Sequence, residues 1–168
     1  CKEFLKATGG KINDVRMGAQ ELCLRYLTIL SCYQWENRKL QHYYGLMKSM
    51  DAEILKLNTC QTEVLADIAE HFRQVMDLCY LILGEKSFCK PGSRLINKSL
   101  FSSWAVVLTR YLNREAEIRK NVESIFRQYW QELNENMTFY SAITSSTGTK
   151  RHLIEALDTV RGIVEENL

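Results

Sequence analysis

The chain has 168 residues, of which 46% are hydrophobic and 25% are charged, and its formal net charge is +2. This length and balance are typical of one globular domain and exclude a disordered chain, a collagen repeat and a coiled-coil rod. One proline and eight glycines provide too few turn residues for a barrel or sandwich of short strands. We therefore expect an all-α fold, an irregular bundle of about five to seven helices with no significant sheet.

Residues 1–168 are expected to form a single helical domain. A candidate subdivision lies near residues 90–93, where Pro91 and Gly92 interrupt the helical pattern. Because the sequence begins at Cys1, with no initiator methionine and no apolar leader, we expect it to be a fragment of a longer chain.

Basic residues are concentrated in one part of the chain. Residues 90–151 contain ten Lys and Arg against five Glu, whereas residues 1–89 are balanced. A band of this size can attract an anion or an acidic partner. Since most such bands are only solvated helix surfaces, both interpretations stay open.

The cysteines and the hydropathy pattern bear on location. The six cysteines form no C-x-x-C pair, and most fall at apolar positions where a reduced thiol acts as a small hydrophobic side chain. We therefore expect a cytoplasmic location. The sequons Asn97-Lys98-Ser99 and Asn136-Met137-Thr138 would permit a secreted cytokine-like bundle, which is the less favoured alternative. No apolar run approaches the ~20 residues that span a bilayer, so no membrane partner is expected.

The first long helix is expected to be central and buried. Asn13 and Asp14 form a polar pair suited to capping, and residues 22–30 are apolar on nearly every side of a helix. Arg25 is the exception in this run. An ion pair with Glu21, one turn earlier, is one explanation, and a contact to something outside this fragment is the other.

Two further helices are expected before the proline. One is predicted at residues 37–48, with apolar or aromatic side chains at Leu40 and Tyr43. Residues 51–83 keep helical spacing throughout and predict one long amphipathic helix, kinked near residues 58–60. Gly84 is placed to end it as a left-handed cap. Its acidic stripe, interpreted as a solvated face, comprises Glu63, Asp67, Glu70 and Asp77, with Gln74.

The apolar spacing in the second half of the sequence predicts three helices. Asn97 or Ser99 is expected to cap a helix with one apolar face that includes Phe101 and Trp104. The remaining expected elements are a helix at residues 114–133, a short turn at 139–143, a polar loop at 144–150 and a final helix at 153–164.

No metal or catalytic constellation is recognised in the sequence. His42, His71 and His152 fall on separate helices, and none completes the Glu-x-x-His pair of a di-metal bundle. The sequence has no Walker loop, no G-x-G-x-x-G and no H-E-x-x-H. We therefore expect no metal, no cofactor and no catalytic residue in this chain.

Two polar helix starts form the candidate site. Residues 145–150 lead into a helix, where backbone N–H groups, hydroxyls and a lysine can bind phosphate or carboxylate. If packing brings the two starts together, an anion or a partner domain is expected to contact them. The alternative is that each start lies on its own surface, where Thr147 or Thr149 only caps a helix. The candidate residues are Arg94, Asn97, Lys98, Thr147, Gly148, Thr149 and Lys150.

Four segments occur in an order that resembles a known family. They are residues 14–27 (DVRMGAQELCLRYL), 82–90 (ILGEKSFCK), 94–108 (RLINKSLFSSWAVVL) and 139–151 (FYSAITSSTGTKR). They contain a Q-E-L-x-L-R helix, an L-G-x-x-x-F helix end, an R-x-x-N-K-x-L-F helix start and the Gly148-Thr149-Lys150 loop. Together they resemble the helical part of the GmrSD-type restriction and defence family, also described as domain of unknown function 262.

The resemblance implies an upstream ParB/sulfiredoxin-like α/β domain with an Asp-Gly-Gln-Gln-Arg type motif, linked to nucleotide hydrolysis and to restriction of modified phage DNA. The present sequence contains no Asp-Gly pair. We therefore expect a non-catalytic helical domain that supports the α/β domain of the same chain and contributes to a DNA-facing surface. The parent protein would be the nuclease or nucleotidase. An autonomous helical protein–protein interaction module is the alternative.

Overall fold

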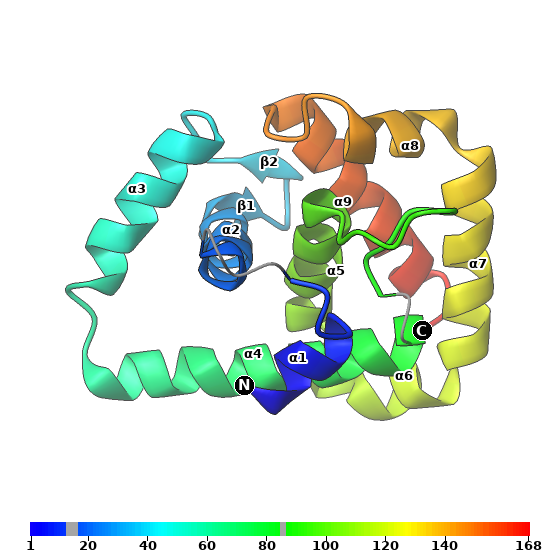
Figure 1. The fold of residues 1–168 in the computed structure, drawn as a ribbon, viewed down its shortest axis with the longest axis horizontal. Helices are drawn as coiled ribbons and strands as arrows, with labels where there is room; N and C mark the ends of the chain where they lie inside the picture. Colours follow the sequence, from blue (N-terminus) through cyan, green and yellow to red (C-terminus); the bar gives the residue numbers. More distant parts are fainter. Residues whose placement is uncertain (13–16, 85–86) are drawn as a thin grey trace.

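The computed structural model describes residues 1–12, 17–84 and 87–168 (Figure 1). Asn13 and Asp14, the pair expected to cap the first buried helix, lie outside the described residues. The described elements are α1 (Lys2–Ala7), α2 (Gly18–Cys32), β1 (Tyr33–Gln34), β2 (Lys39–Leu40), α3 (Leu46–Leu57), α4 (Thr62–Leu83), α5 (Lys98–Arg110), the 3₁₀ turn η3 (Leu112–Arg114), α6 (Glu115–Lys120), α7 (Val122–Glu135), α8 (Met137–Thr144) and α9 (Lys150–Glu165). The expected all-α class is confirmed.

Helix α5 occupies the centre of the fold, where it packs against α2, α4 and α9 (Figure 1). All residues from 99 to 108 are buried. Ser102 and Ser103 tolerate this burial because their hydroxyls donate to carbonyls one turn earlier, those of Lys98 and Ser99, both at 2.9 Å. The expected single apolar face was therefore too narrow, since this helix is enclosed on every side.

The expectation that residues 22–30 form a central, buried helix is met only in part. Helix α2 lies between α3 and α5 and leaves Leu24, Leu27 and Leu30 only partly buried. An apolar run shows that a helix is covered on several sides, and it does not show which helix the others surround.

The helix expected at residues 37–48 is absent. The chain instead forms a short antiparallel hairpin that pairs Tyr33 with Leu40 and Gln34 with Lys39, and α3 begins only at Leu46. Gly45 precedes α3 with φ of 96°, a backbone conformation incompatible with a continuous right-handed helix. Leu40 is buried because strand β2 lies against α9. Its burial is therefore due to tertiary packing and not to the apolar face of a helix.

Two expected long helices are divided in the structure. Residues 51–83 belong to α3 and α4, which are separate helices joined through residues 58–61. The region 114–133 contains η3, α6 and α7, with a break at Asn121. These breaks, the helix α8 in place of a turn at 139–143 and the unexpected helix α1 more than offset the missing helix at 37–48, so the described residues hold nine α-helices. Gly84 ends α4 with a positive φ of 64°, but its ψ of −153° lies outside the left-handed helical region.

A single hydrophobic cluster includes residues from both sides of residues 90–93. Phe101 of α5 contacts Phe88 and Phe4 with ring-centroid distances of 4.9 and 5.9 Å. Trp104, which is fully buried, meets Tyr129 of α7 edge-on at 5.0 Å. The described core therefore connects the two halves of the chain across the proline.

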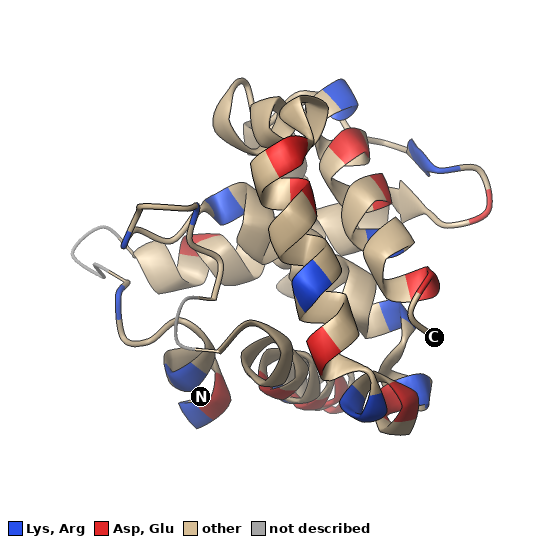
Figure 2. Ribbon diagram, turned by 90° about the vertical axis from the view of Figure 1, so that its right-hand side faces the viewer, with Lys and Arg blue, Asp and Glu red and all other residues tan. Residues whose placement is uncertain are grey.

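Charged residues of both signs are interspersed over the helices (Figure 2). Within the basic band, Arg114 pairs with Glu117 and Arg119 pairs with Glu115, both at 2.6 Å. The acidic stripe of α4 is exposed, in agreement with a solvated face. All six cysteines are free thiols. No helix among the described residues is long and apolar enough to cross a membrane.

Candidate functional site

A small hollow lies where the start of α5 meets the loop before α9. Its volume is about 340 Å³, and we call it the α5 hollow. Three of the predicted residues, Asn97, Lys98 and Thr147, line it. The other lining residues are Arg25, Lys90, Ser93, Leu95, Ile96, Ser99 and Ile143. The structure therefore brings part of the two polar helix starts together.

Asn97 holds the two sides of the hollow in place. Its Oδ1 accepts hydrogen bonds from the backbone N–H groups of Ser99 and Leu100, both at 2.9 Å, so it caps α5 as predicted. Its Nδ2 donates to the carbonyl oxygen of Ile143 in α8 at 2.7 Å. Both ends of the side chain are therefore hydrogen-bonded within the fold.

Arg25 is the residue of the hollow that the sequence did not single out as a site. It is only 4% exposed, and its Nη2 donates to the carbonyl oxygen of Thr147 at 3.2 Å. Its buried Nε has no hydrogen-bond partner among the described residues. Burial lowers the pKa of the guanidinium, and the nearby Tyr43 and Glu21 side chains offset part of this effect.

Of the two explanations of Arg25, the ion pair with Glu21 is wrong, and the contact to something outside this fragment stays a prediction. Glu21 forms its ion pair with Lys98 of α5, at 2.6 Å, and not with Arg25. The contact that Arg25 makes is to Thr147, within this chain. The sequence signal for this site was a charged residue inside an otherwise apolar run, because such a residue needs a specific partner when buried.

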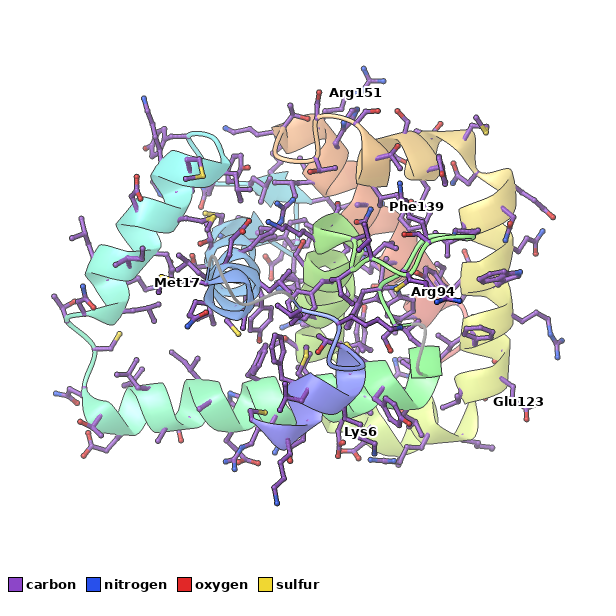
Figure 3. All side chains as sticks on the ribbon, in the orientation of Figure 1. Lys6, Met17, Arg94, Glu123, Phe139 and Arg151 are labelled. Atoms are coloured by element: carbon purple, nitrogen blue, oxygen red, sulfur yellow. The ribbon has the colours of Figure 1, made fainter. Side chains whose placement is uncertain are left out.

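The remaining predicted residues do not line the hollow. The Gly148 carbonyl accepts a hydrogen bond from the Tyr43 hydroxyl, and Thr149 caps α9 through the N–H of His152 at 3.4 Å. Lys150 is exposed at the start of α9. Arg94 lines a separate, larger cleft, and Figure 3 shows it beside α7 and far from Arg151, which follows Lys150. The full convergence of both starts at one site is therefore not observed.

The α5 hollow offers donors and positive charge. The Arg25 and Lys98 side chains can donate to a carboxylate or phosphate oxygen, although Lys98 already pairs with Glu21 at 2.6 Å. Within the described parts of the chain, no group of three or more His, Cys, Asp and Glu side chains could hold a metal ion. Comparisons with protein-family models, curated proteins and solved structures find no match to this chain.

Proposed function

We propose that this chain is a non-catalytic helical domain of a GmrSD-type phage-defence protein. It supports the α/β domain of the parent chain, contributes to a DNA-facing surface, and receives an anionic group at the α5 hollow. The family assignment rests on the order of the four segments described above.

One observation carries the proposal. The four segments, although scattered along the sequence, all contribute to the lining of the α5 hollow. Residues 14–27 provide Arg25, residues 82–90 provide Lys90, residues 94–108 provide Asn97, and residues 139–151 provide Thr147. Sequence features that shape one hollow together are expected where the hollow has a function.

The burial of the Arg25 guanidinium favours the binding of an anionic group at the α5 hollow. Burial of a guanidinium costs several kcal/mol of hydration free energy. A well-formed ion pair contributes a stabilisation of about the same size. The Thr147 carbonyl replaces part of that hydration, but the Nε–H group still lacks an acceptor. A carboxylate from the α/β domain, or a DNA phosphate, would supply a charged acceptor to this guanidinium.

A comparison of substitutions at Lys98 and Lys150 distinguishes this proposal from a general effect of positive charge. In the full-length protein, Lys98→Ala is expected to weaken binding to phage DNA with modified bases about three- to tenfold. The slope of log K against log salt should fall by about one, because one phosphate contact is lost. Lys150→Ala is the matched control, since Lys150 does not line the hollow, and it should change neither quantity. Fluorescence anisotropy over a salt series measures both.

Two results would contradict the proposal. Equal effects of the two substitutions would show that only the overall charge matters. Unchanged binding and slope in Lys98→Ala would leave the hollow with a purely structural role. The non-catalytic assignment has its own test: nucleotide or DNA turnover by this chain that a point mutation within it abolishes would refute it.

An autonomous interaction module is the second candidate, favoured by a different surface. Ile54 and Leu55 of α3, and Val64 and Leu65 of α4, are exposed apolar side chains on two helices that follow one another in the chain. Such a group is common where proteins bind one another. The sequence encoded upstream of Cys1 separates the candidates. An α/β segment with Asp-Gly-Gln-Gln-Arg supports the first, and its absence supports the second.

A further inference from the structure

The first half of α4 continues the core-facing side of this helix beyond the core itself. In the second half, this side is buried where α4 packs against α1, α5 and α7. Val75 has no exposed surface there, whereas Leu65 is 40% exposed and Val64 is 45% exposed. The residues of this side follow one another at alternating steps of three and four, and they are Leu65, Ile68, Phe72, Val75, Cys79 and Ile82. The apolar side of α4 is therefore longer than the surface that this chain packs against it.

Phe72 marks the end of the covered part of α4. Its ring lies 5.5 Å from that of Tyr26 in α2 and 5.7 Å from that of Phe4 in α1, measured between ring centroids. In the turns before it, every residue from 62 to 71 is exposed except Ile68, which is half-buried. Helices in proteins owe most of their stability to the packing of an apolar face. The first turns of α4 therefore present an apolar face that the described part of this chain leaves uncovered.

Helix α3 has an apolar stripe of the same kind. Met47, Met50, Ile54 and Leu57 follow one another at steps of three, four and three residues. Helix α3 packs against α2 and Met50 is buried, but Ile54 is 41% exposed and Met47 is 69% exposed. Figure 1 shows α3 and the first half of α4 diverging from the turn that joins them, with α2 on the inner side of α3 and α5 on the inner side of α4. The two stripes therefore face the inside of one open angle. We call the uncovered part the α3–α4 face, which comprises Met47, Ile54, Val64, Leu65 and Ile68.

The margin of the α3–α4 face is acidic. Together, α3 and α4 contain six Asp and Glu against three Lys and Arg. Glu63 and Asp67 lie about one turn apart on α4, and Asp51 lies beside the apolar stripe of α3. All three are exposed. Two of the three cations, Lys56 and Arg73, already pair with carboxylates of their own helix. This charge favours a basic partner, whereas a second copy bound through the same face would bring like charges together.

We propose that the α3–α4 face binds an amphipathic helix of another protein, one with an apolar side and with Lys or Arg at its edges. The apolar side packs on Ile54 and Leu65, and the basic residues pair with Glu63, Asp67 and Asp51. Amphipathic helices bind through residues at steps of three and four, which is the spacing of both stripes. The proposal rests on the second candidate function, since it names the partner of that surface, and it does not involve the α5 hollow.

Two fluorescently labelled peptides test this assignment in the full-length protein. One is a helix of two heptads with leucine on one side and lysine on the other, and its counterpart carries glutamate in place of lysine. Fluorescence anisotropy measures the affinity of each. The lysine peptide should bind about tenfold or more tightly than the glutamate peptide, because like charges repel the latter. Ile54→Asp/Leu65→Asp should weaken the lysine peptide about tenfold or more, although it adds negative charge, because a carboxylate is costly to bury in an apolar contact.

Three further variants separate the contributions. Glu63→Gln/Asp67→Asn should weaken the lysine peptide about three- to tenfold at low salt, and less at high salt, since salt screens exposed charges. Met137→Asp is the matched control, because Met137 is an exposed apolar residue of α8, away from α3 and α4 (Figure 1), and it should change neither affinity. Lys98→Ala should also leave peptide binding unchanged, so failure of the α5 hollow and failure of this face give different results.

Each alternative result overturns the proposal. If neither peptide binds, or if both bind equally, the face does not select a basic helix. If Ile54→Asp/Leu65→Asp binds the lysine peptide as tightly as the unaltered protein does, the attraction is only electrostatic. If the unaltered protein sediments as a dimer that this double variant dissociates, a second copy covers the face. All the substituted side chains are exposed, and an unchanged circular dichroism spectrum verifies that each variant folds.

Discussion

Trp104→Ala is expected to lower the free energy of unfolding by about 3–5 kcal/mol, the cost of removing a buried aromatic ring from a packed core. Trp104 has no exposed surface and contacts Tyr129 edge-on, between the central helix α5 and α7. The surrounding helices cannot close the resulting cavity without moving as whole elements. Urea denaturation followed by far-UV circular dichroism gives the free energy and its denaturant slope.

Two companion variants keep this prediction testable if Trp104→Ala does not fold. Trp104→Phe retains a ring in the site and should lose less stability than the alanine variant. Tyr44→Ala removes an aromatic side chain that is 71% exposed and should change the free energy by no more than about 0.5 kcal/mol. Similar losses at Trp104 and Tyr44 would contradict the assignment of α5 as the centre of the core.

Asn97→Ala should have the second largest effect, a loss of about 2–3 kcal/mol. About 1 kcal/mol comes from the cap on α5, and the rest comes from the hydrogen bond to the Ile143 carbonyl, which loses its donor. Both contacts are present in the structure, with donor–acceptor distances of 2.7–2.9 Å. The same denaturation experiment measures the loss.

Asn136→Ala provides the matched control, because Asn136 caps α8 in a similar manner. Its Oδ1 accepts from the Phe139 N–H at 2.9 Å, but its Nδ2 donates to Glu132, one turn earlier in the sequence. Its loss should therefore be near 1 kcal/mol, the ordinary value of a cap. Equal losses at the two positions would show that the bond from α5 to α8 contributes nothing measurable.

Local features of this protein were predictable from the sequence alone. The helical class followed from the apolar spacing and the scarcity of turn residues. The sequence offered Asn97 or Ser99 and Thr147 or Thr149 as caps, because a short polar side chain can reach the N–H groups one turn ahead, and the structure shows that Asn97 and Thr149 are the residues that cap α5 and α9. The left-handed cap expected at Gly84 is not formed, because only its φ, and not its ψ, falls in that region.

The tertiary structure alone decided which surfaces meet. The spacing of Leu40 and Tyr43 matched a helix, yet Leu40 lies in a hairpin and Tyr43 in the loop after it, and both are buried. Elements distant in sequence can bury apolar residues at any spacing, so this spacing alone does not identify a helix. Arg25 found its acceptor in Thr147, 122 residues away, and Lys6 lines one cleft with Lys90 and Arg94. The spacing of apolar residues shows which side of a segment is buried. It does not show which other segment covers that side. The α5 hollow is formed between segments distant in sequence, so it became visible only once the helices were packed.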